Sequence, residues 1–255
     1  MTVLADPRPA LAQPIAKPNA FVRRLATLAP LTMDDLLAVS RLTMHPRRVK
    51  TGVDLTRPET RLDHVVVVLD GYACRYKLRK DGRRQNLTCM VAGDLSDLDG
   101  VILGRTTCAI ATLSACTVVE VPTKSLLDLI EHHPNVTRAL RLAKLTDEAI
   151  AHQWIMQLGS YSASERLAHL FCELLFRLRV VGLIPDDNAF PLPLSQLALS
   201  DILGLSSVHV NRSLQKLRQD GMITLKAGML HVLSLSRLME HAEFTSDYIA
   251  GKAPR

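Results

Sequence analysis

The stretch LSQLALSDILGLSSVHVNRSLQKL, residues 194–217, decides how the rest of this chain is interpreted. Ser195 can cap a short helix, and Gly204 then supplies the residue without a Cβ that a tight turn between two helices requires. A second helix is predicted from Ser206 onward. Apolar residues at three- and four-residue spacing predict the buried sides: Leu199, Ile202 and Leu203, then Val210, Leu214 and Leu217. The other side of the second helix is polar or basic: Ser207, His209, Asn211, Arg212, Lys216 and Arg218.

Two crossed helices, the second with a basic face, are typical of a helix-turn-helix. The segments Met222–Leu225 and Met229–Leu233 then flank Lys226-Ala227-Gly228, which predicts a small hairpin. A hairpin directly after a recognition helix is the wing of a winged helix. This order favours DNA binding over the alternative interpretation, two surface helices of an all-α domain.

The composition bounds the class of protein. A chain of 255 residues predicts two domains, and no apolar run approaches the ~20 residues of a membrane span. Residues 1–20 hold four prolines and no apolar signal core, so we expect a disordered tail and a cytoplasmic protein. The five cysteines are scattered and form no C-x-x-C pair, which favours buried, reduced thiols without a metal; a redox-sensing cysteine stays an alternative.

The net charge of +6 suits a nucleic-acid partner, but its distribution does not carry the argument. Residues 1–159 hold 21 basic against 16 acidic side chains, and residues 160–255 hold 10 against 9. The DNA-binding half is therefore almost neutral. The local charge is what favours DNA, because Arg212, Lys216 and Arg218 lie on one helix with no carboxylate between them.

From about Val49 to Val121 the pattern changes to period two and short apolar runs, which predicts strands. These strands are expected at residues 65–69, 74–78, 86–91, 108–113 and 116–121. Asp81-Gly82 predicts a two-residue hairpin turn. Many short strands with glycine turns favour a compact β-roll or barrel. The charged run at 75–84 is interpreted as a solvated strand face, with a contact surface for an anionic ligand or a partner protein as the alternative.

A long helix is predicted over Pro134–Leu158 and is expected to end at Gly159. Its apolar surface exceeds a single stripe, so we expect one side to pack on its own domain and another on a second copy. The alternative is a helix packed wholly within one chain. The residues expected on the dimer side are Leu142, Leu145, Ala149, His152 and Met156. Ser162 and Glu165 then form a capping box that opens the next helix.

With both halves laid out, the chain resembles the Crp/Fnr family of bacterial transcription regulators over residues ~21–245. The shared strings are DGRRQ (81–85), AGDL (92–95), HP (133–134), SASERLAHLFCEL (162–174) and LGLSSVHVNRSLQKLRQDGMI (203–223), of which the last two are the specific ones. The resemblance implies an α+β chain that begins with a β-roll sensor, a double-stranded β-helix of jelly-roll type. A dimerisation helix and a C-terminal winged helix-turn-helix follow.

The domains expected are a tail at 1–20, the β-roll at 21–132, the dimerisation helix at 133–159, the DNA-binding domain at 160–245 and a second tail at 246–255. The resemblance further implies a homodimer on a palindromic double-stranded DNA site, with the 206–218 helix of each copy in successive major grooves ~34 Å apart. It implies regulation through contacts with RNA polymerase, or through its obstruction.

The segment that follows Gly93-Asp94 differs from the same segment in the cyclic-nucleotide binders of the family. Those members carry a Glu for the ribose and an Arg-Ser pair for the phosphate. Here the Glu position falls near Asp97 or Leu98, the Arg-Ser pair falls on Thr107-Cys108, and Arg105 is displaced. We therefore expect no tight binding of cyclic AMP, because the phosphate lacks its charge-assisted contact. The effector-pocket candidates are Asp94, Leu95, Ser96, Asp97, Arg105, Thr106 and Thr107.

No cysteine precedes Cys74, so the iron–sulfur cluster of the oxygen-sensing members is not expected. Haem stays an alternative, with His64 and Cys74 as candidate ligands. We expect no cofactor and no metal site, and an effector of unknown identity, if one exists.

Because no H-E-x-x-H, Walker or G-x-S-x-G motif occurs, no enzyme is expected.

The DNA-reading positions also differ from members that read a TGA-type half-site. Val208 occupies the position where those members carry a Glu that accepts from cytosine, and it offers only apolar contact, for instance with a thymine methyl. Arg212 matches the base-reading arginine. The DNA-binding candidates are Ser195, Ser206, Ser207, Val208, His209, Asn211, Arg212 and Lys216. The alternative function is a β-roll module that regulates a partner protein without DNA.

Overall fold

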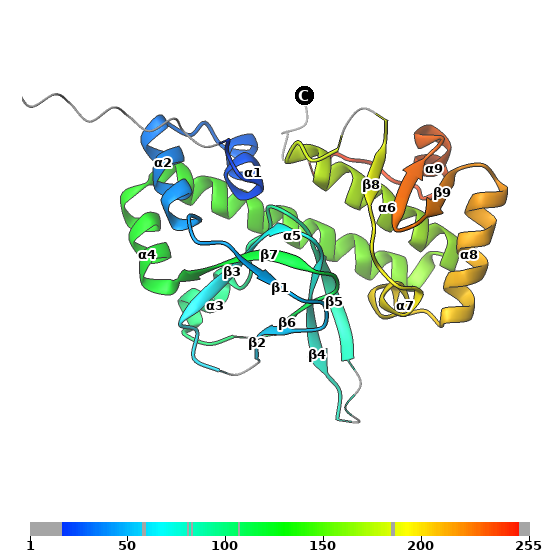
Figure 1. Cartoon of the computed structure of the whole chain (residues 1–255), viewed down its shortest axis with the longest axis horizontal. Coiled ribbons are helices and arrows are strands. Elements are labelled where there is room, and N and C mark those ends of the chain that lie inside the picture. Colours follow the sequence, from blue (N-terminus) through cyan, green and yellow to red (C-terminus); the bar gives the residue numbers. More distant parts are fainter. Residues whose placement is uncertain are drawn as a thin grey trace, which may run out of the picture.

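The computed structural model describes residues 17–57, 60–80, 82, 84–106, 108–184 and 187–249. Most of both predicted tails and the effector candidate Thr107 lie outside these residues. Figure 1 shows a β-roll and a helical domain joined by one long helix, α5 (Pro134–Ser160), which runs along both. This α+β order of β-roll, long helix and winged helix is the one expected from the sequence.

The β-roll consists of two antiparallel sheets. The first has the order β1 (Arg47–Val49), β7 (Cys116–Pro122), β3 (His64–Asp70). The second has the order β2 (Asp54–Thr56), β6 (Ala109–Thr112), β4 (Ala73–Leu78), β5 (Arg84–Met90). The five predicted strands are confirmed, whereas β1 and β2 were not predicted because three residues are too few to show alternation.

Strand β3 is buried on both faces, which explains its unbroken run of four valines. Val65 and Val67 pack against the helices with Leu25 and Leu126, while Val66 and Val68 pack between the two sheets. Alternate side chains of a strand point to opposite faces, so an apolar run without alternation is expected where both faces are covered. The first sheet therefore lies between the second sheet and a layer of helices.

The turn between β4 and β5 corrects one prediction. The strand pairing ends at Leu78 and Arg84, so the connection comprises residues 79–83 rather than two residues. The Gly82 amide donates to the Arg79 carbonyl at 2.9 Å, which makes Gly82 the fourth residue of a turn and not one of its two central residues. A register shift at Arg75 and Tyr76 accompanies the longer connection.

Helices cover the first sheet on its outer side. They are α1 (Ala20–Leu28), α2 (Met33–Leu42), α3 (Leu98–Leu103) and α4 (Thr123–His132). Helix α2 begins with a complete capping box between Thr32 and Asp35. Helix α5 continues through Gly159 to Ser160, slightly beyond its predicted end, because Gly159 keeps the helical backbone.

The C-terminal domain begins with α6 (Ala163–Val180), whose capping box of Ser162 and Glu165 is confirmed. The two helices of the helix-turn-helix are α7 (Gln196–Leu203) and α8 (Ser207–Gln219). The wing is a sheet of order β8 (Ala189–Pro191), β10 (Met229–Val232), β9 (Ile223–Lys226), and α9 (Leu235–His241) follows. Ala227 and Gly228, both with positive φ, form the predicted hairpin turn.

A buried histidine makes the stability of this domain dependent on pH. His169 of α6 is only 2% exposed, between the rings of Phe244 and Tyr248. Burial lowers the pKa of His169 from 6.5 to about 4, because the charged imidazole loses its hydration. The folded chain thus favours neutral His169. Its stabilising contribution is fully present above pH 6.5 and is lost as the pH falls through the folded pKa.

We expect the free energy of unfolding of the wild type to fall by up to about 3 kcal/mol on this account between pH 6.5 and pH 4. His169→Gln, which cannot titrate, should show a shallower decline in urea unfolding measured over the same range. His231→Gln, at an exposed histidine of β10, is the matched control and should keep the wild-type profile. Identical profiles for both variants would contradict the assignment.

Candidate DNA-recognition helix and effector pocket

The geometry of the helix-turn-helix follows from two serine caps and one glycine. Ser195 Oγ accepts from the Ala198 amide at 3.1 Å and starts α7, and Ser206 Oγ accepts from the His209 amide at 3.3 Å and starts α8. Between them Gly204 adopts φ +60°, the left-handed conformation that glycine tolerates best. Both cap serines thus have a structural role.

The buried sides of α7 and α8 are those predicted from the spacing, with one serine added to each. The predicted apolar residues are all buried, as are Ser200 and Ser213. Ser200 Oγ donates to the Gln196 carbonyl at 2.8 Å and lies 3.3 Å from Ser207 Oγ, where the two helices approach. A small residue at this contact allows the close crossing.

The opposite side of α8 is open to solvent. Its exposed residues are Ser206, Ser207, Val208, His209, Asn211, Arg212, Gln215 and Lys216. Among the described residues, no hydrogen-bond or ion-pair partner lies within reach of the Arg212 guanidinium, whereas Lys216 pairs with Asp220 at 3.2 Å. Arg218 instead donates to the Leu225 carbonyl at 3.2 Å and ties α8 to strand β9. The face therefore presents one uncommitted arginine among polar side chains.

The predicted dimer residues lie on one side of α5. Leu145 is 59% exposed and Met156 46% exposed, His152 is exposed, and Leu142 and Ala149 are half-buried. The other side of the helix, with Val136, Leu140 and Ile150, is buried against its own chain. An apolar stripe is thus left on the outer side of a helix that is already packed on its inner side.

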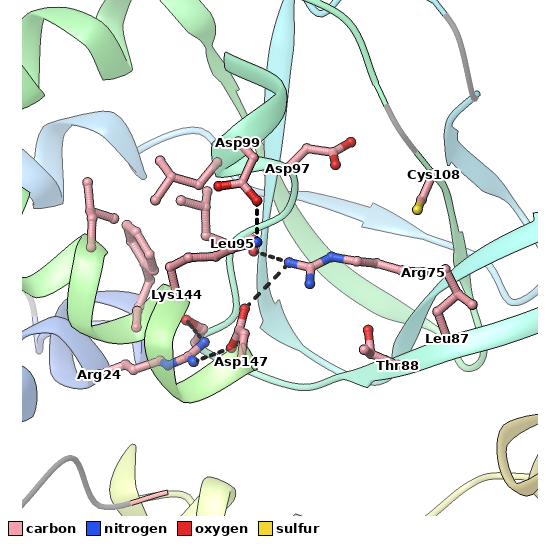
Figure 2. A pocket seen from close by; sticks show the side chains of 15 residues that line it. Arg24, Arg75, Leu87, Thr88, Leu95, Asp97, Asp99, Cys108, Lys144 and Asp147 are labelled. Carbon is pink, nitrogen blue, oxygen red and sulfur yellow. Dashed lines mark hydrogen bonds and ion pairs between the residues drawn. The ribbon is translucent and has the colours of Figure 1, made fainter. Parts of the chain in front are cut away.

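A cavity of about 220 Å³ lies between the β-roll and α5. Figure 2 shows Arg75 of β4 reaching Asp147 of α5 (3.6 Å) and the Leu95 carbonyl (2.9 Å). Arg24 of α1 binds the same Asp147 at 2.8 Å, and Lys144 of α5 pairs with Asp99. Burial opposes ionisation of Asp147, but the nearby arginines prevail and lower its pKa.

The structure brings only some of the effector candidates together at this cavity. Leu95 and Asp97 line it, as does Cys108. Ser96 accepts from the Val66 amide at 2.8 Å, and Thr106 donates to the Arg57 carbonyl at 2.5 Å, both away from the cavity. Arg105 is exposed, and its backbone forms an isolated antiparallel β-bridge with that of Arg61.

Asp94, the remaining candidate, lies beneath the cavity in a buried ion cluster. It binds Arg24 of α1 and Arg177 of α6, and it accepts from the Val91 amide at 2.7 Å. Arg177 also binds Glu173 at 2.7 Å and the Cys89 carbonyl at 3.0 Å. Asp94 therefore joins the β-roll to the first helix of the DNA-binding domain.

Apart from Asp97, the charged residues of the cavity were not among the sequence-predicted candidates: Arg24, Arg75, Asp99, Lys144 and Asp147. They come from α1, β4, α3 and α5, which the fold brings together. Arg75 alone had a sequence signal, because it belongs to the charged run 75–84, for which a surface for an anionic ligand was the alternative interpretation. Of the cysteines, Cys74, Cys89, Cys116 and Cys172 are buried, and burial raises the pKa of Cys74 to about 11 and of Cys172 to about 12.

Two family models match the two halves of the chain. Residues 46–133 match the cyclic nucleotide-binding domain, and residues 165–241 match the Crp-like helix-turn-helix domain. The transcriptional activator protein FnrL of Cereibacter sphaeroides is 26% identical over 89% of this chain and 91% of its own length. The nitrogen fixation regulation protein FixK of Bradyrhizobium diazoefficiens is 29% identical over 67% and 70%.

The fold is similar to that of FixK2 from Bradyrhizobium japonicum, with a TM-score of 0.67 and 24% identity over 77% of this chain and 96% of that one. A β-roll of the cyclic nucleotide-binding type followed by a Crp-like helix-turn-helix defines a DNA-binding transcription regulator. The chain belongs to the Crp/Fnr family. Regulators of this family bind DNA and typically act as dimers.

None of the helices in the described residues has the length and apolarity to cross a membrane.

The buried ion cluster predicts a large loss of stability when one partner is removed. Arg177→Met leaves Asp94 and Glu173 as buried carboxylates with fewer counter-charges, so we expect a loss of about 3–5 kcal/mol in urea unfolding. Arg47→Met, which breaks the exposed pair with Glu120, is the control and should cost less than ~1 kcal/mol. Equal losses would show that the cluster does not stabilise the chain.

Proposed function

We propose that the chain binds a two-fold symmetric DNA site as a homodimer, with α8 of each copy in the major groove. The observation that carries this proposal is the exposed face of α8, which is polar and basic while its apolar side is buried. A helix with that division can enter a groove about 12 Å wide and reach base edges without exposing its own core.

The exposed side chains of α8 fall into two groups, candidates for contacts with base edges and candidates for contacts with phosphates. Arg212 forms no hydrogen bond or ion pair with the described residues, and we assign it to guanine O6 and N7, while the exposed Val208 would contact a thymine methyl. Asn211 and Ser207 are further base-edge candidates. His209 and Lys216 serve phosphate contacts, as do Ser195 and Ser206 through the N-termini of their helices.

Dimerisation is proposed through the outer stripe of α5. Leu142, Leu145, Ala149, His152 and Met156 repeat at three- and four-residue spacing, as in a two-helix seam. Pairing two α5 helices would bury this stripe and set the two α8 helices about one DNA turn, ~34 Å, apart. The domain assignment follows: residues 21–132 sense, 133–159 dimerise and 160–245 bind DNA.

The cavity beside α5 is the proposed effector pocket. Its three cations, Arg24, Arg75 and Lys144, all have carboxylate partners, so a cyclic phosphate would have to break an existing ion pair to be bound. This supports an effector other than cyclic AMP. Regulation would act through contact with RNA polymerase. The protein would work in the cytoplasm, because its DNA target lies there.

The experiment for this proposal is selection of bound duplexes from random DNA by the purified chain, without added ligand, at one stated salt concentration. Salt must be fixed because phosphate contacts set the non-specific background. We expect enrichment of a palindrome with half-sites one turn apart. Enrichment of single, unpaired half-sites would contradict the dimeric arrangement.

Arg212→Ala should cost ~1–3 kcal/mol in affinity for the selected site and relax the preference at one base position. The affinity for random duplex DNA should change much less, because a base contact adds nothing there. Arg237→Ala, which removes an exposed arginine of α9, is the charge-matched control. An equal loss on selected and random DNA would instead make Arg212 a phosphate contact.

Leu145→Glu should convert the dimer to monomer in analytical ultracentrifugation, because it places a charge in the middle of the proposed seam. Leu233→Glu is the matched control, since Leu233 is 58% exposed and lies outside α5. A Leu145→Glu chain that remains dimeric would place the dimer interface elsewhere.

A further inference from the structure

A second, larger cavity of about 510 Å³ lies where the β-roll, the long helix and the DNA-binding domain meet. Its lining comes from β5, α5, α6 and α7, and Figure 1 shows α7 close to β5 on this side of the molecule. Most of its wall is apolar: Leu87, Trp154, Ile155, Leu158, Leu170 and Leu203. This cavity shares Leu87 and Thr88 of β5 with the effector pocket proposed above, but the rest of its lining differs, because that pocket lies along the first half of α5.

Gln157 of α5 is a lining residue of the cavity with an unpaired hydrogen-bond donor. The residue is only 5% exposed, and among the residues that the structure describes its buried Nε2 atom has no hydrogen-bond partner. Buried amide groups are almost always hydrogen-bonded, because leaving one unpaired forfeits its hydration without return. An acceptor supplied by a bound molecule would satisfy this group.

Arg166 of α6 places an unpaired cation in the same wall. It is the one charged residue of this lining, it is half-buried, and it donates to the Leu203 carbonyl. In the described part of the chain no carboxylate forms an ion pair with it. Burial accordingly lowers the pKa of Arg166, and no neighbouring carboxylate offsets this shift.

We propose that this cavity binds a small amphipathic carboxylate. The carboxylate would accept hydrogen bonds from the Arg166 guanidinium and the Gln157 amide, while its apolar body lies along the side chains of α5 and α7. One cation and one neutral donor suit a monoanion rather than a dianionic phosphate. The apolar walls exclude a compact polar metabolite.

The position of the cavity gives such a ligand a route to the DNA-binding face. Ile202, Leu203 and Gly204 belong to α7 and to the turn before α8, while Leu87 belongs to the β-roll and Ile155 to the dimerisation helix. A molecule that contacts all three parts would bind differently when they move relative to one another. This regulatory consequence rests on the proposed DNA-binding function, whereas the binding itself does not.

The test uses Trp154, the one tryptophan of the chain, which lines the cavity. Its fluorescence is followed in the full chain without DNA during titration with decanoate, below the micelle concentration. Decanol and decyltrimethylammonium are the neutral and cationic controls. We expect a saturable change with decanoate at a concentration at least 10-fold lower than with either control. No change, or an equal response to all three, would overturn the proposal.

Four variants locate the binding. Arg166→Gln should weaken decanoate binding at least 10-fold, and Gln157→Leu at least 3-fold. Ala151→Phe, which fills the cavity and breaks no hydrogen bond, should abolish it in a chain that keeps Arg166. Arg237→Gln, distant from the cavity, should bind like the wild type. Undiminished binding by folded Arg166→Gln or Ala151→Phe would show adsorption elsewhere and refute the site, whatever the result of the DNA selection.

Discussion

The arrangement of the whole molecule depends on one buried carboxylate. Asp94, 3% exposed, lies shortly after strand β5 of the β-roll and is bound by Arg24 from α1 and Arg177 from α6. A carboxylate removed from water is stable only when counter-charges compensate it, so both arginines must stay in place. The ion cluster around Asp94 thereby fixes α6 to the β-roll, next to the apolar cluster that the two domains share.

Two surfaces of the described residues stay exposed. The inner side of α5 packs against its own chain, so the outer apolar stripe is open to solvent, and we propose that a second copy covers it. The inner side of α8 packs against α6 and α7, so the polar and basic face is open to solvent, and we propose that it contacts DNA.

The elements that the sequence predicted are those whose pattern is local. The helix caps at Ser162 and Ser195, the buried stripes and the wing hairpin all follow from spacings of two to four residues. The ion cluster does not, because Asp94 meets its two arginines across 70 and 83 residues of chain. The sequence therefore placed Asp94 among the effector candidates, whereas in the structure its carboxylate is bound by these arginines. The missed cavity residues share this cause.

The central claim is that two α8 helices, held by paired α5 helices, read two half-sites together. The most direct test measures affinity for duplexes in which two copies of the selected half-site are separated by spacers varied one base pair at a time. A rigid dimer predicts a maximum when the half-site centres lie about 10 base pairs apart, and a loss of at least ~10-fold when they are shifted by half a turn. Affinity that does not depend on the spacing would contradict it.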